Sequence, residues 1–258
     1  AYEIVSRDWS SDVCSSDLTP DGYTLGTVIA AHAANQTLYA KLPYDSVKSF
    51  EHVSLLVTSP LIVCVTNSLP AKSINELIEL AKAKPGTLSF ASSGIGAAAH
   101  LTTELFMSTT GIKMVHVPYK GTAPALQDLI GGQINFMMDT PMPAMLPQAR
   151  AGKVRAIGMA SDKRISIAQD VPTLIEQGVQ VTGGTWVAML APAHTPRAIV
   201  DKLSKVVGEA MRRADNRERF AQLGMEPVGS TSPELTAFLK GEVAKWAKVI
   251  KDANVKID

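Results

Sequence analysis

The residues best suited to chemistry lie in the stretch Ser89–Leu105, where a short strand runs through a turn into a helix. Thr87–Ala91 alternates apolar and polar residues as a strand does, and Leu101, Leu105 and Phe106 recur at helical spacing after the turn. A helix N-terminus presents unpaired backbone N–H groups and the positive end of the helix dipole, so it binds anions. The sequence therefore predicts an anion site at this turn, with the hydroxyls of Ser92 and Ser93 as additional donors.

The same turn allows a different interpretation. The hexapeptide Gly94–Ala99 matches the Gly-x-Gly-x-x-Ala fingerprint of dinucleotide-binding proteins. That fingerprint also needs an acidic residue at the end of the following strand, and no acid lies between Glu104 and Asp128. Lys120 lies in that interval and suits a 2′-phosphate, so an oxidoreductase that uses NADP stays open as the alternative function. A serine nucleophile is disfavoured, because Phe90–Gly94 lacks the first glycine of a nucleophile elbow.

Three further positions have both a functional and a structural interpretation. Tyr119–Thr122 forms a second strand-to-helix turn, in which Lys120 either contacts an anion or is a solvated surface lysine. Asp139 ends a predicted strand, where α/β sheets place ligand contacts. Its carboxylate suits a ligand ammonium or hydroxyl, or it caps the next turn. His100 either lines the site or is a hydrogen-bonded structural histidine, which is the commoner case.

The histidines and cysteines give no metal motif. The histidine and cysteine residues are scattered, at His32, His52, His100, His116, His194, Cys14 and Cys64. We therefore expect no metal and no cofactor, and we interpret Cys64 as a small buried hydrophobe within an apolar run.

The elements that must position these residues alternate along the chain. Predicted strands cover Tyr23–Ala30, His52–Thr58, Leu61–Thr66, Thr87–Ala91, Lys113–Pro118, Gln133–Asp139, Val154–Ala160 and Trp186–Leu190. Predicted helices follow the caps Ser73, Thr195 and Ser232, and also cover Ala97–Thr110, Ala125–Ile130, Met145–Ala151 and Leu174–Gln177. A small-residue loop is expected around Ala31, His32 and Asn35. The alternation predicts an α/β domain with a mostly parallel sheet.

The composition is that of a globular protein. With 258 residues, of which 46% are hydrophobic, the chain can bury one large core or two smaller ones. A net charge of +1 gives no indication of a nucleic-acid partner. No apolar run is long enough to cross a membrane.

The first eighteen residues differ from the rest. Ser-Ser-Asp occurs at Ser10–Asp12 and again at Ser15–Asp17, and the surrounding residues have neither helical nor strand periodicity. The segment resembles a translated sequencing adapter, and a disordered Ser/Asp-rich linker is the alternative. We interpret residues 1–18 as a non-native or disordered segment and exclude them from the fold.

Several motifs together resemble one family. They are Ala91–Gly96 with His100-Leu101, Val117–Gly121, Pro124–Leu126, Asp128-Leu129, Gly131–Gln133, Val171–Thr173 with Glu176 and Gly178, and Trp186 with Ala191-Pro192 and Thr195-Pro196. In this order they resemble the Bug-type solute-binding receptors of tripartite tricarboxylate transporters. The resemblance extends from Thr19 to the C-terminus.

The resemblance implies a type II periplasmic binding protein, made of two α/β lobes with a cleft between them. It implies a periplasmic receptor without catalysis that captures a small carboxylate for the membrane permease subunits of the transporter. Dicarboxylates, tricarboxylates, acidic amino acids and aromatic acids all fit this class. It also implies a monomer, with residues 65–187 as lobe 2 and residues 19–64 and 188–258 as lobe 1.

The resemblance also assigns ligand residues. The family's ligand loop corresponds to Ser92, Ser93, Gly94, Ile95, Gly96, Ala97 and Ala98. Asp139 matches a further cleft residue, and Ala31 would face the ligand from the other lobe. Family members carry an additional upstream segment with a signal peptide, a first strand and a second ligand loop. We therefore expect lobe 1 to be incomplete, with exposed sheet edges and about half of the ligand contacts missing.

Overall fold

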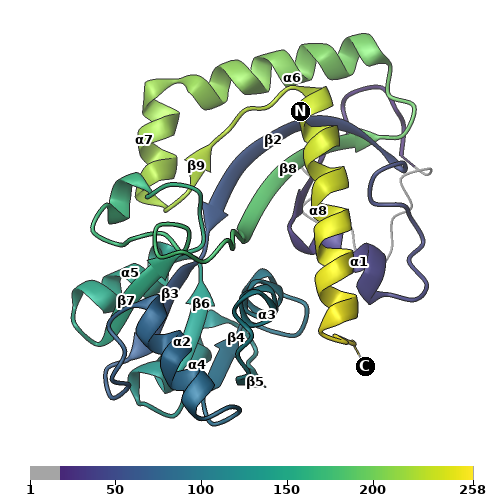
Figure 1. Ribbon diagram of the computed structural model, residues 1–258. Helices are drawn as coiled ribbons and strands as arrows, with labels where there is room; N and C mark the ends of the chain where they lie inside the picture. The colour runs from purple at the N-terminus through teal and green to yellow at the C-terminus, as the bar shows by residue number, and fades with distance from the viewer. Residues whose placement is uncertain (1–17, 258) are drawn as a thin grey trace. The chain divides into compact units, whose positions relative to one another are not determined.

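The computed structural model describes residues 18–257, which form two compact units (Figure 1). Unit 1 contains residues 18–58, Trp186–Phe220 and 226–257, and unit 2 contains Ser59–Thr185 and Ala221–Met225. The segment predicted to be non-native lies outside the described residues except for Leu18, and so does Cys14.

Unit 1 is built on a four-stranded sheet in the order β1-β8-β2-β9. The strands are β1 (Gly26–Ile29), β2 (Phe50–Pro60), β8 (Gly184–Pro192) and β9 (Glu226–Pro227), and the helices are α1 (Ala31–Leu38), α6 (Arg197–Arg212), α7 (Ala214–Gln222) and α8 (Ser232–Asp252). Helix α8 packs against both α1 and α6. Trp186 and Trp246 are buried in this unit, and both indole N–H groups donate to Glu242. β1 is an edge strand, and its Ile29 is 55% exposed.

Unit 2 holds a five-stranded sheet in the order β5-β4-β6-β3-β7. The strands are β3 (Ile62–Thr66), β4 (Ser89–Ser92), β5 (Val115–Pro118), β6 (Phe136–Asp139) and β7 (Val154–Met159), and the helices are α2 (Ile74–Ala83), α3 (Ala98–Thr110), α4 (Thr122–Ile130) and α5 (Leu146–Arg150). A π-helical turn, η2 (Pro141–Met145), and a 3₁₀ turn, η3 (Ser166–Ala168), complete the unit.

The prediction of a mostly parallel sheet is wrong. In unit 2 only β4 is parallel to its neighbours β5 and β6, whereas β3 is antiparallel to both β6 and β7. In unit 1, β1 is antiparallel to β8 and β2 is antiparallel to β9. Strand–helix alternation alone does not determine direction, because the next strand can start at the end of the sheet where the connection begins or after the connection has crossed to the opposite end.

The sheet of unit 2 is buried on both faces. Alternate residues of β3 face opposite sides, so Val63 and Val65 pack with α2 and α3, whereas Ile62 and Cys64 pack with α4 and α5. This double burial explains why β3 is apolar throughout. Cys64 is fully buried, and burial raises the pKa of its thiol to about 12, which confirms its interpretation as a core residue.

Three predicted local features differ from the structure. Ala31 begins helix α1 instead of lying in a loop, in keeping with its alanine-rich sequence. Residues 174–177 form a turn instead of a helix. Helix α6 begins after Pro196, whose carbonyl accepts the Val200 N–H, and the Thr195 hydroxyl donates to the Pro192 carbonyl and does not cap the helix.

The last helix, α8, also begins one residue away from the prediction. Its N-cap is Thr231, not Ser232, and the Glu234 carboxylate accepts the Thr231 N–H at 2.7 Å. The helix therefore has the reciprocal Thr/Glu start of a capping box.

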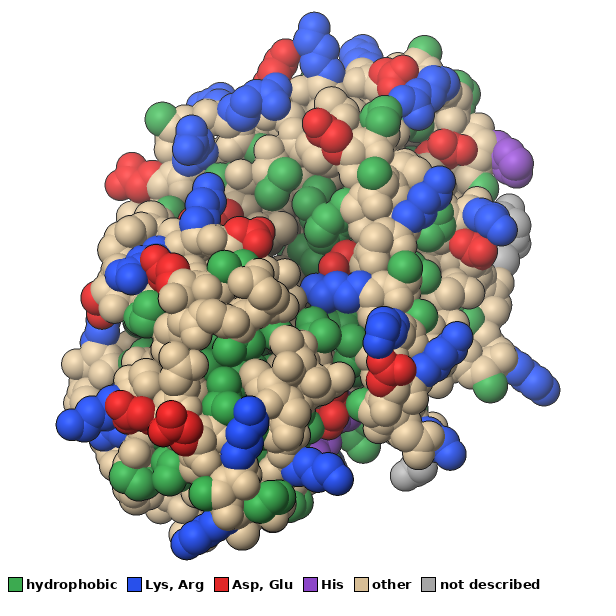
Figure 2. Space-filling view, viewed as in Figure 1, with side chains coloured by type: hydrophobic (Ala, Val, Ile, Leu, Met, Phe, Trp, Pro, Cys, Tyr) green, Lys and Arg blue, Asp and Glu red, His purple; other side chains and the backbone are tan. Residues whose placement is uncertain are grey.

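Charges of both signs are mixed on the visible surface, where Lys and Arg side chains alternate with Asp and Glu (Figure 2). Within residues 18–257, no helix combines the length and the apolar character that spanning a bilayer requires.

Candidate functional site

The turn between β4 and α3 has the backbone geometry of an open loop. β4 ends at Ser92 and α3 begins at Ala98. Between them Gly94 has φ +150° and Gly96 has φ +77°, conformations that side chains with a Cβ rarely adopt. The N-cap residue, Ala97, has no side-chain group with which to cap the helix. The local sequence therefore produces a helix start without an internal cap.

The N-terminus of α3 consequently retains donors for a ligand. The N–H of Leu101 is the first to bond backwards, to the Ala97 carbonyl at 3.0 Å. The three preceding N–H groups, of Ala98, Ala99 and His100, find no partner in the described part of the chain. Three aligned donors at the positive end of a 13-residue helix form a site suited to an anion.

Helix α2 of the same unit provides the contrast. Its cap Ser73 accepts the Glu76 N–H at 3.2 Å, and the Gln177 side chain accepts the Ile74 N–H at 2.9 Å. The N-terminus of α2 is thus occupied by the protein's own side chains. The N-terminus of α3 differs in this respect from that of α2, whereas α4, whose N-cap is Gly121, also lacks a side-chain cap.

The two serines of the turn have different surroundings. Ser92 is fully buried, and its Oγ lies 2.7 Å from Nε2 of His116 and accepts the Gly94 N–H at 3.3 Å. Its hydroxyl therefore shapes the loop from within. Ser93 is half-buried. Ile95, at the tip of the loop, is 46% exposed.

Asp139 lies at the same sheet edge. β6 is parallel to β4, so the carboxyl ends of both strands meet there. The Asp139 side chain is 7% exposed, accepts the Thr122 hydroxyl at 2.7 Å and accepts the Thr140 N–H at 2.7 Å. Burial raises the pKa of its carboxyl, against the opposing effect of these hydrogen bonds. Asp139 thus ties the end of β6 to the start of α4.

The remaining predicted positions are spread more widely. Ala31 lies in unit 1, whereas the loop and Asp139 lie in unit 2. Lys120 is exposed in the β5–α4 turn, and the neighbouring Tyr119 hydroxyl donates to Asp128 at 2.6 Å.

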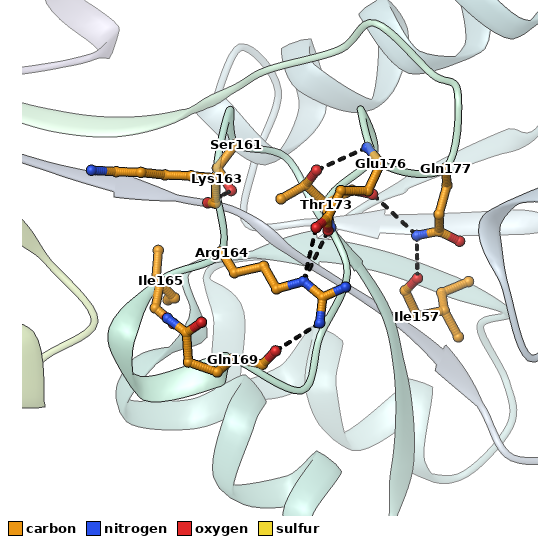
Figure 3. Close-up of polar contacts among 9 residues, drawn as sticks. All are labelled: Ile157, Ser161, Lys163, Arg164, Ile165, Gln169, Thr173, Glu176 and Gln177. Carbon is orange, nitrogen blue, oxygen red and sulfur yellow. Dashed lines mark hydrogen bonds and ion pairs between the residues drawn. The ribbon is translucent and has the colours of Figure 1, made fainter.

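The Val-Pro-Thr…Glu motif forms a self-contained polar cluster at a different place in unit 2 (Figure 3). The Glu176 carboxylate accepts the Thr173 N–H at 2.6 Å and Nε of Arg164 at 2.9 Å, while the Thr173 hydroxyl accepts the Glu176 N–H. Those two donors hold the pKa of Glu176 below its usual range. Gln177 donates to the Ile157 carbonyl of β7. The motif therefore has a structural role in closing this turn on the sheet.

Comparison with known proteins identifies the family. Residues 12–255 match the sequence profile described as tripartite tricarboxylate transporter family receptor. The chain belongs to this receptor family. The match begins at residue 12, inside the segment 1–18 that is predicted to be non-native or disordered.

Solved structures of similar proteins agree with this assignment. The periplasmic binding protein BugD is 35% identical, with a TM-score of 0.76 over 94% of this chain and 82% of BugD. An R. palustris protein, Rpa4515 with adipate, is 32% identical, with a TM-score of 0.80 over 94% and 81%. MatC from Rhodopseudomonas palustris with bound malate is 31% identical, with a TM-score of 0.74 over 92% and 82%.

The family resemblance drawn from the motifs is therefore confirmed, as is the α/β, type II periplasmic binding protein fold. The tripartite tricarboxylate transporter receptors are periplasmic solute-binding proteins, not an enzyme family.

Sequence reasoning did not find two residues that shape this site. Thr122 binds Asp139 from 17 positions earlier in the chain, and His116 binds Ser92 from 24 positions later. Both contacts depend on the pairing of β4 with β5 and β6. The only sequence signal was the position of each residue at or near the end of a predicted strand.

Proposed function

We propose that this protein is an extracytoplasmic receptor that captures a small dicarboxylate at the loop Ser92–Ala98 and delivers it to the permease of a tripartite tricarboxylate transporter. The uncapped N-terminus of α3, with its three unpartnered N–H groups, carries the proposal. A carboxylate that leaves water needs its lone pairs satisfied, and this terminus offers donors at the right place.

The energy of one helix terminus indicates that a second contact is needed. The dipole contributes about 0.3–1 kcal/mol to anion binding, and up to about 2 kcal/mol when the site is partly buried. A single terminus therefore holds a carboxylate weakly. We propose that residues 65–187 form one ligand-binding lobe, and that residues 19–64 and 188–258 form the other, from which Ala31 contributes. In this arrangement Asp139 interacts with a hydroxyl or ammonium of the ligand.

Similar proteins favour a dicarboxylate within the carboxylate class. Two similar proteins of known structure, 31–32% identical, are Rpa4515 with adipate and MatC with bound malate. Small side chains at Ala97, Ala98 and Ala99 leave room beside the loop, which suits recognition by backbone groups and water. The receptor is expected to act as a periplasmic monomer.

The variant Ala97→Asp tests this site, with malate and adipate as the titrants in isothermal titration calorimetry. An aspartate at the N-cap accepts the free N–H groups itself and repels an incoming carboxylate, so dicarboxylate affinity should fall at least about tenfold. The same cap should stabilise the folded protein by about 1 kcal/mol. If Ala97→Asp loses dicarboxylate binding but unfolds at a higher temperature, the loss of binding is a local effect at the site and not the result of a destabilised fold.

Ala237→Asp is the matched control, because it makes the same residue and charge change at an exposed position inside α8. It should leave dicarboxylate binding unchanged. If NADP binds to the unmodified protein and neither dicarboxylate does, the proposal is wrong and the oxidoreductase alternative replaces it. Unchanged dicarboxylate affinity in Ala97→Asp would also contradict it.

A further inference from the structure

Three stacked rings lie directly behind the ligand loop. His116 of β5 stacks on His100 of α3 with the ring centroids 3.9 Å apart and the planes 13° apart. Phe90 of β4 stacks on His116 at 4.7 Å. His100 is 5% exposed and His116 is half-buried. Two imidazoles in such close contact are coupled, since a charge on one opposes a charge on the other.

Each imidazole holds one end of the loop. Nδ1 of His100 accepts the Gly96 N–H at 3.1 Å, where the backbone has φ +77°. Nε2 of His116 lies 2.7 Å from the Ser92 hydroxyl, which also accepts the Gly94 N–H. The pair therefore contacts both ends of the loop that leads into α3, the helix that carries the open N–H groups.

The contact with Gly96 defines the protonation state of His100. A backbone N–H can only donate, so Nδ1 of His100 must be unprotonated and its proton must reside on Nε2. That Nε2 faces the Glu104 carboxylate at 3.6 Å. A proton added to Nδ1 would face the Gly96 N–H, donor against donor, and the hydrogen bond would be lost.

Few other charges surround the pair. β4 contributes no ionisable side chain, and α3 contributes only Glu104 besides His100 itself. From β6 only Asp139 is ionisable, and it is bonded to Thr122 and Thr140. Lys113 and Lys120, which flank β5, are exposed. Burial and the neighbouring His100 lower the pKa of His116 to about 4, and Nε2 of His100 lies 3.6 Å from the Glu104 carboxylate.

We propose that His100 and His116 are positioning residues of the carboxylate site, and that the loop Ser92–Ala98 keeps its binding geometry only while Nδ1 of His100 is free to accept the Gly96 N–H. Acidification therefore weakens dicarboxylate binding by releasing Gly96. This inference rests on the proposed function for the ligand. A positively charged imidazolium would attract the carboxylate ligand and so favour binding at low pH. The negative charge of Glu104 offsets this attraction.

The test compares dicarboxylate affinity at pH 8.0 and pH 5.5 by calorimetry, with malate and adipate as probes. His100→Asn keeps an acceptor near the position of Nδ1, and His116→Gln keeps a polar group near Nε2, but neither residue titrates. The affinity at pH 8.0 divided by the affinity at pH 5.5 should be about tenfold larger in the unmodified protein than in the double variant His100→Asn/His116→Gln. A factor of about ten is the effect of one buried hydrogen bond. Protonation of the ligand cancels in this comparison.

Replacing His100 by Leu removes the acceptor altogether, so affinity should fall at both pH values, and His100→Asn should restore most of it. His194→Gln is the control, because His194 is exposed in unit 1. It should keep the pH ratio of the unmodified protein. An equal pH ratio in the unmodified protein and the double variant, or tighter binding at pH 5.5, would overturn the proposal.

A second measurement does not depend on ligand binding. The amide resonance of Gly96 in the unliganded protein should shift between pH 8.0 and pH 5.5, and this shift should be absent in His100→Asn. If this amide titrates but no dicarboxylate binds, the proposed function fails and the positioning role stands. If a dicarboxylate binds but this amide does not titrate, the positioning role fails and the proposed function stands.

Discussion

Thr102 is fully buried on α3, and its hydroxyl has no hydrogen-bond partner among the described residues. Its side chain packs directly on the backbone of Gly183, where an added Cβ would lie 2.4 Å from both Oγ1 and Cγ2. The contact is thus one of shape and not of hydrogen bonding. The next residue, Thr103, is equally buried, but its hydroxyl donates to the Ala99 carbonyl at 2.8 Å.

These two neighbours make a matched pair of substitutions. Thr102→Val keeps the shape and removes an unpaired buried hydroxyl, so the free energy of unfolding should rise by about 1 kcal/mol. Thr103→Val removes a hydrogen bond that is made, so stability should stay equal or fall by about 1 kcal/mol. Urea unfolding followed by circular dichroism measures both. The interpretation of Thr102 is wrong if its valine variant is the less stable of the two.

At the scale of elements, α2 and α3 use their N-termini differently. The side chains of Ser73 and Gln177 accept N–H groups of the N-terminus of α2, and the Glu76 carboxylate accepts the Lys72 N–H at 2.7 Å. The capping residue predicted at Ser73 is therefore confirmed, although the Glu76 carboxylate bonds one residue further back than a capping box requires. The N-terminus of α3 has no such groups, which leaves it available to a ligand.

Ser73→Ala should lower the free energy of unfolding by about 1 kcal/mol, because the Glu76 N–H loses its acceptor. Ser73→Asp should retain most of the stability, since aspartate is an equally good cap. Thermal and urea unfolding of the two variants give the comparison. Equal losses in both variants would indicate that the hydroxyl does not cap α2.

At the scale of the whole molecule, both units contain histidines whose pKa is lowered by burial. His32 donates to the Ser46 carbonyl and stacks on Tyr44, and His52 contacts the Thr236 hydroxyl at 2.7 Å. Burial lowers the pKa of both residues in unit 1, as it does for His116 in unit 2. Unfolding exposes these rings to water and restores their ordinary affinity for protons.

Stability should therefore decrease on mild acidification. Each lowered pKa means that the unfolded chain binds a proton more tightly, so its contribution is fully present above about pH 6.5 and is lost as the pH falls towards the folded-state pKa. The slope is at most about 1.4 kcal/mol per pH unit for each histidine. Unfolding temperatures measured from pH 8 to pH 5 test this expectation. His52→Gln should flatten the profile, whereas His194→Gln should not.

The sequence by itself determined the local features of the site. The β4–α3 turn was predicted because strand alternation, Gly94, Gly96 and the helical spacing after them are all short-range signals. The family followed from motifs in their order along the chain. The strands were mostly predicted within a few residues, because burial imposes a readable period on a strand.

Tertiary structure alone decided how these pieces combine. Contacts between distant segments make β3 antiparallel to β6. Such contacts also pair β4 with β5, which stacks Phe90 on His116 and brings the His116 ring to Ser92. Such contacts leave no periodic signal, because each partner has an ordinary local sequence. The same holds for Thr122 and Asp139, which meet only because parallel strands end at one edge. The sequence thus determines where the proposed carboxylate site lies, and the fold determines what holds that loop in place.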